Sequence, residues 1–137
     1  MPDYTPKPVE PFTPQVLDRV WGQEIFVAET PHYLGKLLKM RAGTAGGLQI
    51  HVDKDETFYL HSGRALVDYD PGNGSIVSVQ MEPGEAYHIP PGAVHRVRAL
   101  TDCEFFEAST PHYDDRVRME GHYGVPVLGA PGLPTTR

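Results

Sequence analysis

Three residues with metal-binding side chains lie close together in a glycine-bounded stretch of the chain. The stretch Gly43 to Gly63 has the spacing G-x5-Q-x-H-x4-E-x6-G, which contains Gln49, His51 and Glu56. Residues two apart on an extended chain point to the same face of a sheet, so Gln49 and His51 are expected to share a face. A turn over the polar run 52–55 would bring the Glu56 carboxylate opposite His51. These donors predict a metal site between two strands.

A second pattern supplies another histidine. Residues 84–95 have the spacing G-x5-P-x-G-x2-H, in which Pro90 and Gly92 predict a tight turn and His95 begins the next strand. His95 can be the fourth ligand. Two imidazoles with two oxygen donors suit one divalent transition metal, which could be Zn, Mn, Fe, Ni or Co. The alternative is a metal-free barrel in which the four groups hydrogen-bond one another.

The elements that must position these residues are short strands. Among 137 residues there are 14 glycines and 14 prolines, and this composition favours many short elements joined by turns. Strands are expected at 23–28, 33–40, 57–60, 64–69, 76–81, 87–89, 94–100 and 104–108, with a hairpin turn at Gly63 and a helical turn around 114–120. Strands recurring every eight to twelve residues predict an all-β sandwich or barrel in a single domain.

The two ends of the chain are expected to be irregular. Five prolines in residues 1–14 exclude a helix and a central strand, so this segment is predicted to be an extended arm. Tyr4, Val9 and Phe12 give the arm apolar groups that could pack on a partner subunit, and the alternative is a frayed terminus. The expected organisation is an arm at 1–14, a barrel domain at 15–124 and an irregular tail at 125–137. A homodimer is the expected assembly.

Composition also narrows the classes of partner and location. The formal net charge of -6 disfavours nucleic acid, which is held mainly by clustered Lys and Arg. No apolar run approaches the roughly 18 to 20 residues that cross a bilayer, and the first residues do not have the pattern of a signal peptide, so a cytoplasmic protein without membrane contact is predicted. The single cysteine, Cys103, excludes an internal disulfide; a buried inert thiol is favoured over a nucleophile.

Together the two patterns resemble motifs one and two of the cupin superfamily, over roughly residues 33–108. The resemblance implies a double-stranded β-helix, or jelly-roll, barrel. It also implies a metal held by Gln49, His51, Glu56 and His95, with glutamine replacing the first histidine that cupins usually have. A second departure is Ala99, where motif two often has asparagine.

Longer segments resemble the mannose-6-phosphate isomerase type of cupin, which includes the isomerase domain of bifunctional mannose-6-phosphate isomerase/mannose-1-phosphate guanylyltransferases. The segments are 20–25, 48–63, 89–97 and 109–124. Glutamine in the first ligand position is common in this type. Val125 departs from it, because the family usually has arginine there. The resemblance implies a metal-dependent aldose-ketose isomerase in carbohydrate metabolism, acting on a sugar or sugar phosphate.

Candidate catalytic and substrate-binding residues follow from that activity. Lys36 and His88 are candidate bases for moving a proton between C1 and C2 of the sugar. Arg19 and Lys36 are candidate phosphate-binding cations, and His61 could line the barrel mouth. Strand parity leaves two alternatives for Lys36, because both faces of the strand at 33–40 carry apolar groups: it points inward with Leu34 and Leu38, or it is solvated.

Two other functions remain open on the same residues. Cupins with the same ligand set carry out oxygen chemistry, which would make the protein an iron-dependent dioxygenase. A third hypothesis is a cupin that binds a sugar without turnover. Oxygen uptake, proton exchange at C2 and binding without product distinguish the three.

Overall fold

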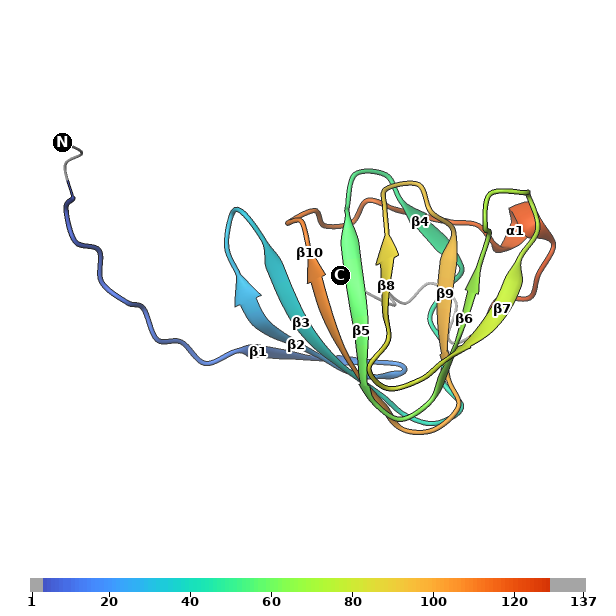
Figure 1. Ribbon diagram of the computed structural model, residues 1–137, viewed down its shortest axis with the longest axis horizontal. Helices are drawn as coiled ribbons and strands as arrows, with labels where there is room; N and C mark the ends of the chain where they lie inside the picture. Colours follow the sequence, from blue (N-terminus) through green and yellow to red (C-terminus); the bar gives the residue numbers. More distant parts are fainter. Residues whose placement is uncertain (1–3, 129–137) are drawn as a thin grey trace.

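The computed structural model describes residues 4–128, which fold into two antiparallel sheets that face each other as a barrel (Figure 1). The six-stranded sheet contains, in spatial order, β1 (Gln15–Arg19), β2 (Gly22–Glu29), β3 (Leu34–Met40), β10 (Cys103–Ser109), β5 (Glu56–Ser62) and β8 (Ala86–Ile89). The five-stranded sheet contains β11 (Arg116–Arg118), β4 (Gln49–His51), β9 (His95–Ala99), β6 (Ala65–Tyr69) and β7 (Val77–Met81). One short helix, α1 (Glu120–Tyr123), follows β11. The predicted all-β barrel is confirmed.

Alternation along the strands separates the barrel interior from its surface. On β5, Glu56, Phe58 and Leu60 point inward and are buried, whereas the residues between them are exposed. On β10, Phe105 and Glu107 likewise point inward. The interior therefore has an apolar part and a polar part. The apolar part stabilises the barrel by removing side chains from water, and it includes Trp21, Leu38, Met40, Phe58, Leu60, Val67, Met81 and Phe105.

The expected hairpin around Gly63 is wrong, because β5 and β6 belong to different sheets. Gly63 has φ 88°, and a Cβ there would lie 2.2 Å from the carbonyl oxygen of Asp102. Only glycine tolerates both conditions. The Pro90–Gly92 turn also joins strands of different sheets, β8 and β9. A glycine turn in the sequence signals a chain reversal but not whether the two strands then pair.

The two ends of the described chain differ in part from expectation. An additional strand, β1, pairs with β2 at the edge of the six-stranded sheet. The helical turn expected around 114–120 is replaced by β11, which pairs with β4, and α1 begins only at Glu120. Here the ladder hydrogen bonds with β4 outweigh a weak local helix signal.

The arm and the tail contain no assigned strand or helix over residues 4–14 and 125–128. The arm extends away from the barrel (Figure 1). Residues 1–3 and 129–137, which complete the predicted arm and tail, lie outside the described residues. Across residues 4–128, no helix is long and apolar enough to span a membrane.

Candidate metal centre

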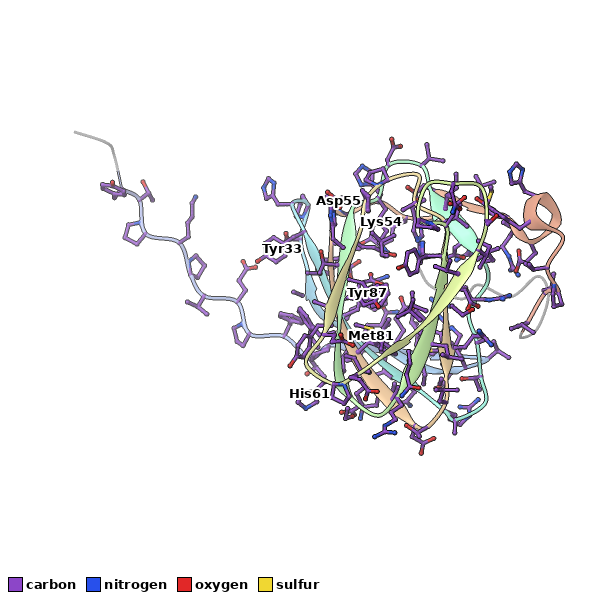
Figure 2. The ribbon with its side chains drawn as sticks, turned by 45° about the vertical axis from the view of Figure 1, so that its right-hand side comes forward. Tyr33, Lys54, Asp55, His61, Met81 and Tyr87 are labelled. Atoms are coloured by element: carbon purple, nitrogen blue, oxygen red, sulfur yellow. The ribbon has the colours of Figure 1, made fainter. Side chains whose placement is uncertain are left out.

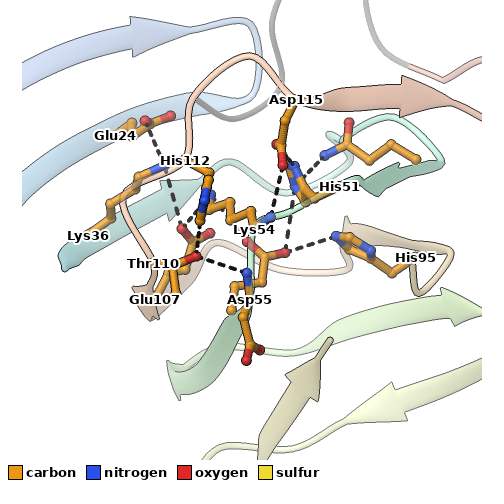
Figure 3. A network of polar contacts seen from close by, with 12 residues as sticks. Glu24, Lys36, His51, Lys54, Asp55, His95, Glu107, Thr110, His112 and Asp115 are labelled. Atoms are coloured by element: carbon orange, nitrogen blue, oxygen red, sulfur yellow. Dashed lines mark hydrogen bonds and ion pairs between the residues drawn. The ribbon is translucent and has the colours of Figure 1, made fainter. Parts of the chain in front are cut away.

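Three buried side chains from three strands meet inside the barrel (Figure 3). His51 ends β4, Glu56 begins β5 and His95 begins β9, and their ligand atoms all lie within 4.8 Å of one another. Nε2 of His95 is 3.0 Å and Nε2 of His51 is 3.8 Å from Oε1 of Glu56. Two imidazoles and a carboxylate form the donor set of many divalent transition-metal sites.

The other ring nitrogens of the two histidines are held by acceptors. Nδ1 of His51 lies 2.9 Å from Oδ1 of Asp115, and Nδ1 of His95 lies 3.0 Å from the carbonyl oxygen of Ala93. A carboxylate and a carbonyl only accept hydrogen bonds, so each Nδ1 is assigned as the donor. In a neutral imidazole, Nε2 then carries a lone pair. For His95 this lone pair would face the Glu56 carboxylate, and the two electron-rich groups would repel each other. A proton or a metal cation between them removes this repulsion. The geometry thus fits a metal.

The electrostatics of the three side chains also suit a cation. Burial would raise the pKa of Glu56, but the hydrogen bond with His95 and the charge of Lys54 hold it well below its ordinary value. Burial lowers the pKa of His51 despite the nearby Glu56 carboxylate. Burial would lower the pKa of His95 too, but its hydrogen bond to Glu56 and the charge of that carboxylate raise it. The site therefore holds a carboxylate and at least one neutral imidazole, the forms that bind metals.

Gln49 lies beside these three residues, as predicted, and is paired with His95 across the β4–β9 ladder. Its side chain is buried, and its Nε2 lies 3.4 Å from Nε2 of His51. An amide nitrogen is a hydrogen-bond donor and does not bind a metal. For Gln49 to bind through oxygen, its side-chain amide must be turned by about 180°, so that Oε1 takes the position of Nε2. The structure thus brings all four predicted ligands together, and ligation by Gln49 stays a prediction.

Lys54 occupies the other side of the Glu56 carboxylate. Its ammonium nitrogen lies 3.3 Å from Oε2 of Glu56 and 3.1 Å from Oε2 of Glu107, and the side chain is fully buried. Burial would lower the pKa of Lys54, but the Glu107 and Glu56 carboxylates raise it above its ordinary value. One oxygen of Glu56 therefore faces the histidines, while the other is held by a buried ammonium.

The ion pairs continue away from the histidines. Nζ of Lys36 lies 3.5 Å from Oε2 of Glu107 and 3.4 Å from Oε1 of Glu24, and Nε of Arg19 lies 3.2 Å from Oε2 of Glu24. Lys36 points inward, so the inward alternative for this residue is correct. Burial lowers the pKa of Lys36, although Glu107 opposes the shift. Both predicted phosphate-binding cations are thus paired with carboxylates.

A cavity of about 60 Å³ is lined by two of the three clustered residues, Glu56 and His95, and by Gln49, whereas His51 does not line it. A cavity needs about 10–15 Å³ to hold one water, so this space is large enough for a metal ion and the reacting part of a small ligand. Glu107 shares the cavity wall, but Lys36 does not. The complete lining is Trp21, Leu38, Met40, Gly46, Gly47, Gln49, Glu56, Phe58, His95, Arg96, Val97, Phe105 and Glu107.

The structure does not bring His61 or His88 to this cavity. On β8 the inward-facing residues are Tyr87 and Ile89, so His88 lies on the outer face, where its Nε2 is 2.7 Å from Oδ1 of Asp55. His61 is exposed on the outer face of β5, at the end of the barrel opposite Lys54 (Figure 2). Strand parity therefore places both histidines away from the site.

Sequence reasoning missed three residues of the site. Lys54 was assigned only to a polar turn, yet it is the lysine closest to the ligand residues. Glu107 could have been found from the alternation of residues 103–109, in which it shares a face with Phe105. Asp115 carries no local signal, because its role depends on β11 pairing with β4.

Comparison with known proteins agrees with this architecture. Residues 36–109 match the family described as the cupin domain. The structure of CapF, a capsular polysaccharide assembling protein from Staphylococcus aureus, superposes with a TM-score of 0.69 at 19% identity, covering 79% of this chain and 32% of that one. KdgF from Halomonas sp. gives a TM-score of 0.60 at 26% identity, covering 68% of this chain and 81% of that one.

Oxalate decarboxylase from Bacillus subtilis gives a TM-score of 0.66 at 16% identity, covering 82% of this chain and 35% of that one. This chain thus spans about a third of the length of CapF and of the decarboxylase. The likeness to these two proteins concerns the fold alone. Comparison with curated proteins finds no match. The family match over more than half of the sequence, together with the barrel and its buried His-Glu-His cluster, identifies the chain as a member of the cupin family.

Proposed function

We propose that the protein is a metal-dependent aldose-ketose isomerase that acts on a sugar or sugar derivative. The observation that carries this proposal is a carboxylate, Glu107, that shares a cavity wall with Glu56 and His95 without belonging to the ligand cluster. Isomerisation needs one group to hold the substrate oxygens and another to move a proton between adjacent carbons. A ligand cluster and a separate carboxylate provide both.

His51, Glu56 and His95 would hold the metal, with Gln49 as the fourth predicted ligand. When bound, a divalent metal supplies Lewis-acid stabilisation of negative charge that develops on substrate oxygens. Asp115 and the carbonyl of Ala93 hold Nδ1 of the two histidines, which orients both Nε2 atoms toward Glu56.

Glu107 is the proposed base in place of Lys36 and His88. Nζ of Lys36 and Nζ of Lys54 contact Oε2 of Glu107, and Glu107 borders the cavity, so its carboxylate would take a proton from a substrate carbon and return it to the neighbouring carbon. Lys36 lies outside the cavity wall, and His88 is on the outer face of the barrel. Trp21, Leu38, Met40, Phe58 and Phe105 give the cavity an apolar wall suited to the C–H faces of a sugar.

The ion pairs favour a substrate without a phosphate in the cavity. Arg19 and Lys36 are each bound to Glu24, so neither offers an uncompensated positive charge. This supports an unphosphorylated sugar over a sugar phosphate. A cytoplasmic location stays a prediction.

The proposal is tested by elemental analysis of protein purified without chelator, followed by proton exchange at C2 in D2O with the restored metal. Mannose and mannose 6-phosphate are the first probes, monitored by NMR. We expect exchange with the wild type and a loss of at least about 100-fold in Glu107→Gln, the lower end of the contribution of a general base. Glu104→Gln, on the outer face of the same strand, is the matched control. Exchange that is unchanged in Glu107→Gln would contradict the assigned base.

A second function is favoured by the ligand cluster itself. Two histidines and one carboxylate are the ligand set of non-haem iron oxygenases. Oxygen uptake by the iron-loaded protein, without C2 exchange in the absence of oxygen, would support this dioxygenase. Tight sugar binding without product under any metal would instead support a non-catalytic sugar-binding cupin.

A further inference from the structure

A groove of about 390 Å³ lies between β8, at the edge of the six-stranded sheet, and the end of β6 in the five-stranded sheet. Tyr69, the last residue of β6, and Tyr87 on β8 both line it. Proline, isoleucine, alanine and valine side chains supply most of the remaining wall. It is named the tyrosine groove below, and the function proposed above does not use its two tyrosines.

The strand registers place the tyrosine groove next to the metal cavity. Tyr69 is the cross-strand partner of His95, and Tyr87 is the cross-strand partner of Phe58. His95 and Phe58 line the cavity. Neighbouring strands lie about 4.8 Å apart, so the groove begins one strand beyond the cavity on each sheet. That distance is comparable with the width of a sugar ring.

The two tyrosines offer both apolar and polar surface to a ligand. Tyr87 points into the barrel (Figure 2), where its ring stacks on Phe58 with centroids 6.0 Å apart and meets Tyr69 edge to face at 6.3 Å. Across residues 4–128, neither tyrosine hydroxyl has a hydrogen-bond partner. Burial raises the pKa of Tyr87, so its hydroxyl keeps its proton and can donate. A ligand with C–H faces and hydroxyl groups matches such a wall.

The charges around the groove favour a neutral ligand. Asp70 lines it, and the hydrogen bonds that its carboxylate accepts from the Tyr123 hydroxyl and the backbone of Gly72 hold its pKa below the ordinary value. Neither lysine nor arginine is among the described residues that line the groove. His88, at its border, is already bound to Asp55. A phosphate or carboxylate on the ligand would meet an acid there without a free cation.

The metal cavity by itself is too small for a whole sugar. Its volume of about 60 Å³ corresponds to about four to six waters at about 10–15 Å³ each, fewer than the non-hydrogen atoms of one hexose. Only the reacting end of a sugar therefore enters it. The tyrosine groove, at about 390 Å³, is an adjoining space within the size range of ligand sites, roughly 300–1,000 Å³.

We propose that the tyrosine groove binds the sugar unit next to the reacting one, so that the substrate class is a neutral oligosaccharide with a free reducing end. This inference rests on the proposed function, because it names the substrate class of the same site. Aldose-ketose isomerisation needs a sugar that can open to its carbonyl form, and in an oligosaccharide only the reducing-end unit can do so. That unit enters the cavity, while the neighbouring unit packs against Tyr87 and Tyr69.

Proton exchange at C2 in D2O, measured by NMR with mannose and with mannobiose, tests the inference on the metal-loaded protein. Contacts in the groove are remote from the reacting carbons and act equally on the ground state and the transition state, so they lower KM rather than raise kcat. We expect the KM of the wild type for mannobiose to be at least about tenfold below its KM for mannose. Equal KM values for the two sugars would overturn the inference.

Variants of the groove assign this preference to its tyrosines. Tyr87→Leu keeps an apolar contact with Phe58 but removes the ring and the hydroxyl, so it should raise the KM for mannobiose at least about tenfold. Tyr69→Leu, on the other wall, is measured beside it, so that a folding defect in one variant does not decide the result. Tyr59→Leu is the matched control, because Tyr59 is exposed on the outer face of β5. Circular dichroism melts establish that each variant is folded, and a KM that neither groove variant changes would overturn the inference.

Binding measured without turnover separates this inference from the proposed function. Saturation-transfer NMR with mannobiose, maltose and cellobiose reports contact with the protein whether or not exchange occurs. Exchange of mannose without binding of any disaccharide would overturn the tyrosine groove as a sugar site and leave the isomerase standing. Disaccharide binding that the groove variants weaken and Tyr59→Leu does not, in the absence of any exchange, would support the groove and overturn the isomerase.

Discussion

Oδ1 of Asp115 lies 2.9 Å from Nδ1 of His51, and Oδ2 of the same carboxylate accepts hydrogen bonds from the backbone N–H groups of Asp53 and Lys54. One side chain, 64 residues away in sequence from the histidine, therefore fixes both the ring and the loop that leads to Glu56. Burial would raise the pKa of Asp115, but these backbone hydrogen bonds and the one with His51 lower it.

Replacing Asp115 is expected to weaken metal binding without removing a ligand. Asp115→Asn should lower metal affinity about 10- to 100-fold, because groups that orient a ligating histidine commonly have effects of that size. Competition with a chelating dye measures the affinity. Asp114→Asn is the matched control, since Asp114 is exposed and its positive φ of 54° is tolerated by asparagine. Equal affinities of the Asp115 variant and the wild type would contradict the positioning role.

Removing a histidine ligand is expected to abolish metal retention. His51→Ala and His95→Ala each delete one of the three clustered donors, so protein purified without chelator should contain little metal by elemental analysis. His88→Ala should keep the occupancy of the wild type, because His88 is bound to Asp55 on the outer face. Unchanged occupancy in both ligand variants would refute the assignment.

Removing the buried ammonium of Lys54 is expected to destabilise the barrel. Lys54→Met leaves the Glu56 and Glu107 carboxylates buried beside an apolar group, and breaking a buried pair in this way costs about 3–5 kcal/mol. Urea unfolding measures the change. Lys39→Met is the control, because its pair with Glu104 is exposed and worth about 0–1 kcal/mol. Similar losses in the two variants would show that burial of Lys54 has no special effect.

Asp68, a buried carboxylate on β6 of the five-stranded sheet, is expected to make the stability of the protein depend on pH. Asp68 accepts hydrogen bonds from Arg98, Ser78 and Arg96. Burial would raise the pKa of Asp68, but these bonds lower it below its ordinary value of 3.8. A depressed folded-state pKa stabilises the protein above that ordinary value, and the contribution is lost as the pH falls through the folded-state pKa.

Asp68→Asn should therefore lower the free energy of unfolding by about 1.5–3 kcal/mol at pH 7. The difference in the free energy of unfolding between wild type and variant should become smaller as the pH falls below about 3.8, the ordinary pKa of an aspartate. Urea titrations at several pH values measure it. Asp18→Asn is the control, since Asp18 is exposed on an edge strand. If this difference in the free energy of unfolding did not change with pH, the ionised form of Asp68 would not be the source of the stabilisation.

The sequence was informative where function depends on local spacing. Gln49 and His51 share a face because they are two apart on one strand, the polar turn at 52–55 brings Glu56 to them, and the Pro90–Gly92 turn brings His95. Local spacing could not assign strands to sheets, so the expected hairpin at Gly63 was wrong. Nor could it reveal contacts made only by tertiary pairing, as for Asp115.

The burial of charged side chains could not be predicted from local sequence patterns either. Lys36 and Lys54 are inside because carboxylates from other strands meet their ammonium groups, as in the contacts of Lys36 with Glu24 and Glu107. Desolvation alone would keep such lysines at the surface. The sequence therefore left the orientation of Lys36 open.

The His-Glu-His cluster takes its donors from both halves of the barrel. His51 and His95 belong to the five-stranded sheet and Glu56 to the six-stranded sheet. An ion bound by all three would cross-link the two sheets. Metal binding and the packing of the sheets against each other would then be thermodynamically linked. Metal binding would then raise the free energy of unfolding of the whole barrel. Glu56 would couple the two effects, because it is the ligand that the six-stranded sheet contributes.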